Sequence, residues 1–264
     1  MMSEKNLLNF AFSNEQKDPT LPVLVFMHGL FGDLNNLGVI ARAFSDQYPI
    51  LRIDLRNHGQ SFHSDDMNYD CLSEDVITLL DHLKIQNAVL IGHSMGGKTA
   101  MMVAGKRPDL VSKLVVIDIA PVNYGEHGHR EIFKGLKAVA AAQVTTRQEA
   151  KQILAQYVQS DAVQQFMLKS FDAQSPQRFR FNVDVLEDNY LAIMDWQEVL
   201  FTKPTLFIKG NDSDYILPQY QVAILRQFPK AKAFVVQGSG HWVHAEKTQS
   251  VIRAITQFLT VNKS

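Results

Sequence analysis

The stretch Ile91-Gly92-His93-Ser94-Met95-Gly96-Gly97 decides the fold of this chain. It places a serine between two glycines in the pattern G-x-S-x-G. An apolar run, Ala88–Ile91, precedes it, and a segment compatible with a helix, Lys98–Lys106, follows it. A strand, a sharp turn and a helix in this order form a nucleophile elbow, in which the serine hydroxyl is exposed at the turn.

The two glycines have a steric function in this turn. A side chain at Gly92 or Gly96 is expected to collide with neighbouring backbone, and glycine also tolerates strained dihedral angles. The turn presents Ser94 at the N-terminus of a helix, where backbone N–H groups can stabilise an oxyanion. We therefore expect Ser94 to be a nucleophile, although so short a pattern also matches glycine-rich turns by chance.

A nucleophilic serine needs a base, and the base needs an orienting acid. His241 is the best candidate for the base, in Gly238-Ser239-Gly240-His241-Trp242 between the last predicted strand and the last predicted helix. That position puts His241 at the carboxyl edge of an open sheet, where ligands bind. The chain order of serine, acid and histidine also fits this architecture.

The acid has three candidates. Asp118 ends the apolar run Val115-Val116-Ile117, so its carboxylate is expected to be buried and to need a partner. Asp212 and Asp214 follow the next predicted strand and reach the same edge of the sheet. At the spacing where an acid is expected in that loop, the chain has Ser213. We favour Asp118 and keep Asp212 and Asp214 as alternatives.

The oxyanion hole is predicted from backbone positions. One donor is the N–H of Met95, directly after the nucleophile, and the other is the N–H of Leu30, in the loop after the first long strand. The loop 54–61 also follows a strand. We interpret it as structural, with its Asp and Arg holding neighbouring loops.

Short apolar runs alternate with amphipathic segments, which predicts an α/β fold with a mostly parallel sheet and helices on both faces. Residues 121–203 interrupt the alternation with helical patterns, one of them opened by the capping box Thr146-Arg147-Gln148-Glu149. We predict a core of residues 1–120 and 204–264 and a helical cap of residues 121–203. The predicted strands are Leu21–Met27, Ile50–Leu55, Ala88–Ile91, Leu114–Ile119, Thr205–Lys209 and Ala233–Gln237. The predicted core helices are Leu34–Tyr48, Tyr69–Leu83, Lys98–Lys106, Tyr220–Phe228 and Gln249–Leu259.

Composition limits the partners of the chain. Its 264 residues carry a formal net charge of −1, which gives no electrostatic footprint for nucleic acid or anionic lipid. The single cysteine, Cys71, fits a reducing compartment, and no apolar run is long enough to span a bilayer. We expect a cytoplasmic monomer or weak homodimer. No metal site is expected, since His127 and His129, with Glu126 and Glu131 nearby, fit no helix-borne zinc pattern.

Five motifs follow one another along the chain. They are His28-Gly29-Leu30-Phe31-Gly32, Arg56-Asn57-His58-Gly59, Gly92-His93-Ser94-Met95-Gly96-Gly97-Lys98, Ile117-Asp118-Ile119-Ala120-Pro121 and Gly240-His241-Trp242-Val243-His244-Ala245-Glu246-Lys247. On these motifs the chain resembles the α/β-hydrolase superfamily over essentially its whole length and, more narrowly, the YbfF-type esterases. The resemblance associates the acid with Asp118 and places Ser213 near the catalytic histidine. It implies hydrolysis of short-chain acyl esters or thioesters without a cofactor.

Two other classes of function stay open at this point, because one fold serves many activities. The same triad could serve a C–C bond hydrolase or a cofactor-free haloperoxidase. A non-hydrolytic receptor could also retain the triad and use the pocket to bind a small molecule.

Overall fold

A computed structural model describes residues 7–13, 18, 20–125 and 128–260 of the chain. Its strands are β1 (Phe10–Ser13), β2 (Val23–Met27), β3 (Ile50–Ile53), β4 (Ala88–His93), β5 (Val111–Ile117), β6 (Thr205–Gly210) and β7 (Ala231–Val236). They form a seven-stranded sheet in the order β1-β3-β2-β4-β5-β6-β7. β1 is antiparallel to β3, and the other neighbours are parallel. The mostly parallel sheet predicted from the sequence is confirmed.

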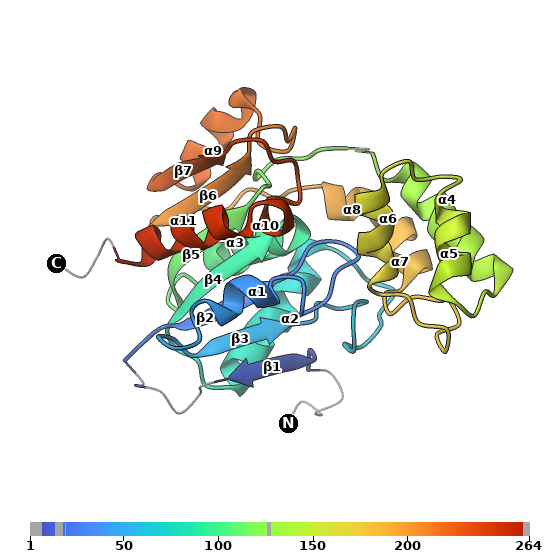
Figure 1. The fold of residues 1–264 in the computed structure, drawn as a ribbon. Helices are drawn as coiled ribbons and strands as arrows, with labels where there is room; N and C mark the ends of the chain where they lie inside the picture. Colours follow the sequence, from blue (N-terminus) through green and yellow to red (C-terminus); the bar gives the residue numbers. More distant parts are fainter. Residues whose placement is uncertain (1–6, 14–17, 19, 126–127, 261–264) are drawn as a thin grey trace.

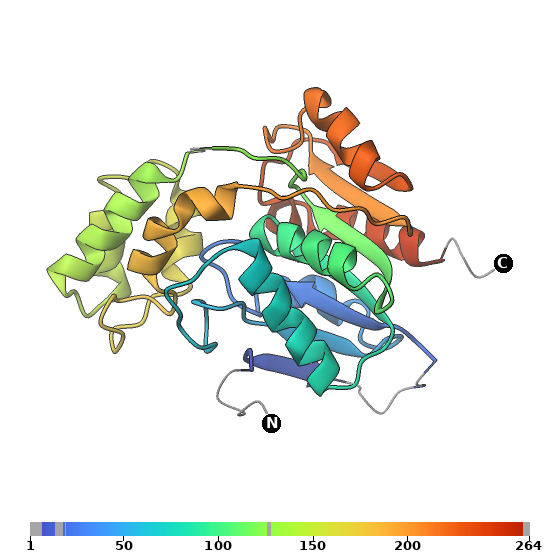
Figure 2. The same cartoon turned by 180° about the vertical axis from the view of Figure 1, so that it is seen from behind.

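Helices cover both faces of the sheet, as near-continuous apolar strands require. The helices of this part of the fold are α1 (Gly38–Arg42), α2 (Tyr69–His82), α3 (Met95–Lys106), α9 (Gln221–Gln227), α10 (Val243–Glu246) and α11 (Thr248–Thr260), with a short 3-10 helix, η2 (Pro218–Tyr220). α1 and α11 lie on one face (Figure 1), and α2, α3 and α9 lie on the other (Figure 2).

Strand β2 illustrates how the sheet is packed on both sides. Val25 and Met27 join the apolar cluster that includes α2 and α3, whereas Leu24 and Phe26 join the cluster that includes α1 and α11. Burying one side chain of this size contributes roughly 1.5–3 kcal/mol. Because a slip of one residue would exchange the two faces, this packing fixes the register and aligns the carboxyl ends of the central strands.

A group of helices lies between β5 and β6 in the chain. It consists of α4 (Arg130–Ala142), α5 (Arg147–Leu154), α6 (Asp161–Leu168), α7 (Val183–Asp188) and α8 (Tyr190–Met194), which gather to one side of the sheet (Figure 1). The capping box of α5 is confirmed: the Glu149 N–H donates to Thr146 Oγ1, and the Thr146 N–H donates to the Glu149 carboxylate. The division into a core and a cap of residues 121–203 stays a prediction.

One local prediction was wrong, and one element was missed. The helix predicted over Leu34–Tyr48 is only the five residues of α1, because Asp33 and Asn36 side chains bond nearby backbone N–H groups and tight turns flank the helix. The edge strand β1 was not predicted, since four residues next to a polar Asn9 give little pattern. None of the helices in the described part of the chain is long and apolar enough to cross a membrane.

Candidate active site

Ser94 occupies the turn between β4 and α3, as the sequence predicts. Its backbone is strained, with φ 52° and ψ −120°, values that residues other than glycine rarely adopt. The turn is also tight, because a Cβ at Gly92 would lie 2.1 Å from the Gly96 carbonyl oxygen, and one at Gly96 would lie 2.4 Å from that of Met27. The strain and the close backbone approach lift the Ser94 side chain out of the end of β4.

His241 lies between the two other residues of the predicted triad. Its Nε2 is 3.0 Å from Ser94 Oγ, and its Nδ1 is 2.8 Å from Asp118 Oδ2. The loop that carries it joins β7 to α10, and the ring of Tyr215 stacks on the imidazole with centroids 3.8 Å apart. The three side chains therefore form one continuous series of hydrogen bonds. The stacked ring of Tyr215 and the two hydrogen bonds fix the orientation of the imidazole.

Asp118 directly follows β5 and is fully buried. Its Oδ1 accepts a hydrogen bond of 2.9 Å from the Gly210 N–H, and its Oδ2 accepts one from the Ser213 hydroxyl. Burial raises the pKa of the Asp118 carboxyl to about 7, and the two donors act in the opposite direction by stabilising the carboxylate. A charge at this position is thus costly in itself and is stabilised by donors from the end of β6 and from the loop after it.

The alternative acids lie in a different environment. The side chains of Asp212 and Asp214 are exposed, while Ser213 between them is buried against Asp118. Of the three aspartates, Asp118 bonds to His241, and Ser213 is brought next to this histidine–aspartate pair.

The two predicted oxyanion donors lie beside Ser94. Met95 is the first residue of α3, and Leu30 lines the same small cavity as Ser94. The neighbouring N–H of Phe31 is not available, because it donates to Nε2 of His58 at 3.1 Å. Among the hydrogen bonds of the described residues, none engages the N–H of Leu30 or Met95. These two amides are thus left for a ligand.

Sequence reasoning missed two buried histidines that join the loop carrying Leu30, after β2, to the loop after β3. His28 Nε2 accepts from the Leu55 N–H at 3.0 Å, and His58 bonds both Phe31 and the Arg56 carbonyl oxygen. Burial lowers the pKa of both imidazoles, so they are neutral. The Arg56-Asn57-His58-Gly59 motif carried the signal, since the loop after β3 lies beside the loop after its parallel neighbour β2. Arg56 in the loop 54–61 forms an ion pair with Asp75 at 2.6 Å, which fits the interpretation of that loop as structural.

The histidines considered for a metal do not form a described site. Glu126 and His127 lie outside the described residues. His129 Nδ1 is 2.7 Å from the Tyr190 hydroxyl. No group of three or more ligand side chains is present in residues 7–13, 18, 20–125 and 128–260.

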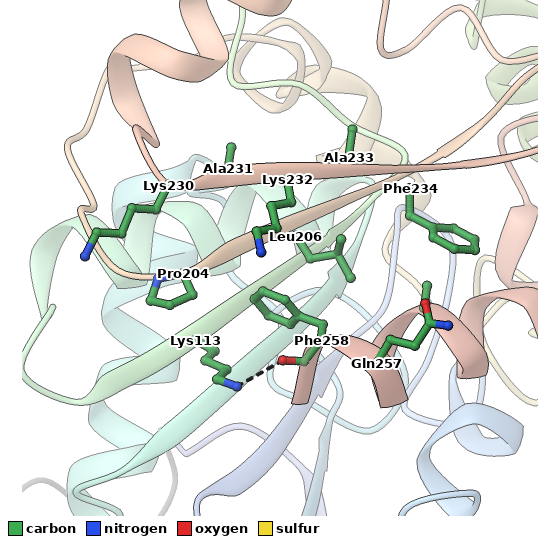
Figure 3. A pocket seen from close by; sticks show the side chains of 11 residues that line it. Lys113, Pro204, Leu206, Lys230, Ala231, Lys232, Ala233, Phe234, Gln257 and Phe258 are labelled. Atoms are coloured by element: carbon green, nitrogen blue, oxygen red, sulfur yellow. Dashed lines mark hydrogen bonds between the residues drawn. The ribbon is translucent and has the colours of Figure 1, made fainter. Parts of the chain in front are cut away.

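Cavity size does not locate this site. The space at Ser94 is only about 20 Å³, whereas a groove of about 500 Å³ lies at the amino ends of β6 and β7 (Figure 3). That groove is lined by lysines and phenylalanines, and Lys113 in it donates to the Phe258 carbonyl oxygen at 3.0 Å. It shares no residue with the cavity at Ser94, and it lies at the opposite end of the strands. A second groove, of about 390 Å³, borders His241 and Trp242.

Known proteins resemble this chain over most of its length. The family described as alpha/beta hydrolase fold matches residues 22–248. A Haemophilus influenzae protein, provisionally named an esterase/lipase, is 56% identical over 98% of this chain and 90% of its own length. Esterase YbfF of Escherichia coli is 44% identical over 96% of this chain and 98% of its own. The solved structure of a marine microorganism esterase has a TM-score of 0.89 at 34% identity and covers 96% of this chain and 99% of that one.

The chain therefore belongs to the α/β-hydrolase family. The resemblance to YbfF-type esterases is confirmed at the level of the whole chain, and within the family the chain is a hydrolase of the carboxylesterase type.

Proposed function

We propose that this protein hydrolyses short-chain acyl esters or thioesters through an acyl-enzyme on Ser94. The supporting observation is the unbroken series of hydrogen bonds from Asp118 through His241 to Ser94, next to two unengaged backbone amides. Such a constellation is recognised by its geometry and roles and recurs on unrelated folds. Esterase names among the relatives point to the same chemistry.

The first step forms the acyl-enzyme. Ser94 Oγ attacks the acyl carbonyl carbon while His241 Nε2 takes the hydroxyl proton, and the amides of Leu30 and Met95 donate to the oxyanion. His241 then gives this proton to the leaving oxygen or sulfur, the bond to the acyl carbon breaks, and the alcohol or thiol departs. The buried carboxylate of Asp118 stabilises the imidazolium that exists between these two transfers.

The second step releases the acid. A water molecule attacks the acyl-enzyme, and its proton passes to His241 Nε2. The proton then returns to Ser94 Oγ as the ester bond to the serine breaks, which regenerates the free enzyme. Nothing in these steps requires a metal ion or an organic cofactor.

The cavity at Ser94 supports a preference for short acyl groups. Ile119, Ile193 and Met194 line it together with Leu30, and its volume of about 20 Å³ is room for little more than one water molecule. An acyl group must therefore widen it or extend into the groove of about 390 Å³ that borders His241 and Trp242. A longer chain gains about 0.8 kcal/mol for each CH₂ that is buried, and an acyl chain that the cavity cannot enclose forgoes this gain. We propose that residues 121–203, which supply part of this wall, act as a cap over the site.

A kinetic screen tests the activity. We expect p-nitrophenyl esters of short acids to be turned over faster than long ones, with acyl-CoA thioesters measured alongside, and no interfacial activation on emulsified lipid. Long-chain triglycerides as the best substrates would contradict the proposal. Turnover restricted to dioxygenase-derived diketones would instead identify a C–C bond hydrolase, and slow single turnover with ligand-dependent stabilisation would identify a receptor.

Covalent labelling tests the nucleophile. Ser94→Ala is expected to lower kcat by at least about three orders of magnitude while the protein folds normally, because the hydroxyl contributes chemistry and little packing. A fluorophosphonate probe should label the wild type at Ser94 and leave the variant unlabelled. Labelling at another serine would overturn the assignment.

A further inference from the structure

Lys98 is a buried lysine to which the mechanism above gives no task. It lies one helical turn after Ser94 in α3, and only 1% of it is exposed. Its Nζ donates to three backbone carbonyl oxygens, those of Val122 at 2.8 Å, Met194 at 3.0 Å and Asp195 at 2.9 Å. The three N–H groups of the ammonium are thus fully used.

Aromatic rings surround the same ammonium. The centroids of Tyr124, Tyr69 and Trp196 lie 4.9, 5.5 and 5.9 Å from Lys98 Nζ. Burial lowers the pKa of Lys98 to about 7, whereas the aromatic faces and the carbonyl dipoles favour the charged form. Lysine is almost never fully buried unless its charge is stabilised. Here the three carbonyl oxygens and the three aromatic rings stabilise the buried ammonium.

The three carbonyl groups belong to two segments that are far apart in the chain. Val122 lies four residues after Asp118, on the way from β5 to the helices α4–α8. Met194 and Asp195 end α8, on the way back to β6. We call residues 122–124 and 193–196 the outgoing and the returning hinge. One ammonium therefore ties both hinges to the helix that begins next to the nucleophile.

The hinges also bond to each other and border the site. The Tyr124 N–H donates to the Met194 carbonyl oxygen at 3.0 Å, and Asn123 Nδ2 donates to the Asp195 carboxylate at 2.6 Å. Tyr124, Ile193 and Met194 line the cavity at Ser94. A shift of either hinge against α3 would therefore change the wall that an acyl group touches.

We propose that Lys98 is a positioning residue that fixes the hinge-borne wall of the acyl pocket against the nucleophile helix and thereby sets which acyl lengths the enzyme accepts. This rests on the ester hydrolysis proposed above. Lys98 itself borders the cavity at Ser94, but all three of its N–H groups are bonded to the hinges, so in this role it touches no reacting atom and acts through them.

Lys98→Met tests the role, since methionine fills similar space and donates no hydrogen bond. We expect KM for a short p-nitrophenyl ester to rise about tenfold, kcat to change less than about threefold, and the preference for short over long acyl chains to fall about fivefold. The rate of inactivation by diisopropyl fluorophosphate, which uses the triad and the oxyanion amides but places no acyl chain against the hinge-borne wall, should stay at the wild-type value. Lys113→Met is the matched control, because Lys113 also donates to backbone carbonyls but lies at the other end of the strands.

Hydrogen exchange gives a readout that does not depend on turnover. In Lys98→Met, amides of residues 122–125 and 190–196 should exchange faster, and those of β4 and β5 should not. If the wild type hydrolyses no ester, the proposed function fails, and the exchange experiment still decides whether the lysine holds the hinges.

The proposal is overturned by either of two results with a folded variant. An unchanged acyl-length profile and unchanged hinge exchange would make Lys98 a packing residue only. Slower inactivation by the fluorophosphate, in proportion to slower ester turnover, would mean that it acts on Ser94 itself. If Lys98→Met does not fold, Lys98→Gln, which keeps a polar side chain but loses the charge and the reach to three carbonyl groups, is measured instead. It should speed exchange in the same two segments, and unchanged exchange there would overturn the proposal.

Discussion

The loop after β5 and the loop after β6 both bring aspartates to the carboxyl edge of the sheet, but the aspartate of the first is buried and those of the second are exposed. Asp118 in the first loop is fully buried, has a strained φ of 52° and bonds to His241. Asp212 and Asp214 in the second loop are exposed. Gly210, the last residue of β6, donates its N–H to Asp118, and Ser213 in the loop donates its hydroxyl. One loop thus holds the charge, and the end of β6 with the loop after it supplies the donors.

The difference shows what a carboxylate needs in order to orient a histidine. An exposed aspartate is stabilised by water and spreads its hydrogen bonds among mobile partners. A buried aspartate has a fixed geometry, but its charge must be stabilised by dedicated donors. Two adjacent strands, β5 and β6, meet these needs together because their carboxyl ends lie side by side in the sheet.

Replacing the buried acid should have the largest effect. Asp118→Asn is expected to lower kcat on the order of 10⁴-fold, the size of the corresponding change in a serine protease triad, because an amide holds the imidazole in the wrong tautomer. Steady-state kinetics on a short p-nitrophenyl ester measures it, with circular dichroism as the check on folding. A loss below tenfold would show that another residue orients His241.

Removing one donor should have a smaller effect. Ser213→Ala removes a hydrogen bond to a charged group, which is worth about 1.5–3 kcal/mol, so kcat should fall by roughly ten- to a hundredfold. The Ser213 hydroxyl lowers the pKa of Asp118, so its loss should also move the acidic limb of the pH–rate profile to higher pH. A profile that moves to lower pH would show that the hydroxyl does not stabilise the carboxylate.

The pH dependence of the wild type follows from the same burial. Asp118 has a pKa raised to about 7, and the carboxylate–imidazole pair must have lost its proton to accept that of Ser94. Log kcat/KM should therefore rise with pH through an apparent pKa near 7 and fall about tenfold per unit below it. A rate independent of pH from about 5 to 9 would mean that this pair does not limit the reaction.

The exposed acids should matter least. Asp212→Asn and Asp214→Asn are each expected to change kcat by no more than about twofold, since surface substitutions are usually worth within about 0.5 kcal/mol. Both variants serve as matched controls for Asp118→Asn, because each removes one carboxylate by the same substitution. A loss in either variant as large as that in Asp118→Asn would move the acid to the loop after β6.

Much of this fold could be predicted from sequence because its signals are local. Buried strands such as Val115-Val116-Ile117 and the glycines around Ser94 carry their structural reasons in consecutive residues. The short strand β1 and the brief helix α1 escaped prediction, since β1 depends on pairing with β3 and α1 on competition from Asp33 and Asn36 side chains.

The parts of the site that could not be predicted depend on residues distant in the chain. His58 reaches Phe31 across 27 residues, and Lys98 reaches Asp195 across 97. No pattern in one short stretch encodes such pairs, so they emerge only when the strands align their ends. The roles of Ser94, His241 and Asp118 remain predictions, and the structure brings these three side chains together.

The position of His241 in the chain has a consequence for biosynthesis. It follows Ser94 by 147 residues and Asp118 by 123, after the last strand of the sheet. Domains are synthesised from the N-terminus, and contacts between distant residues form late. On the mechanism proposed above, Ser94 stays an unactivated alcohol in a nascent chain until His241 is in place, so the onset of hydrolysis during translation or refolding should report the docking of β7.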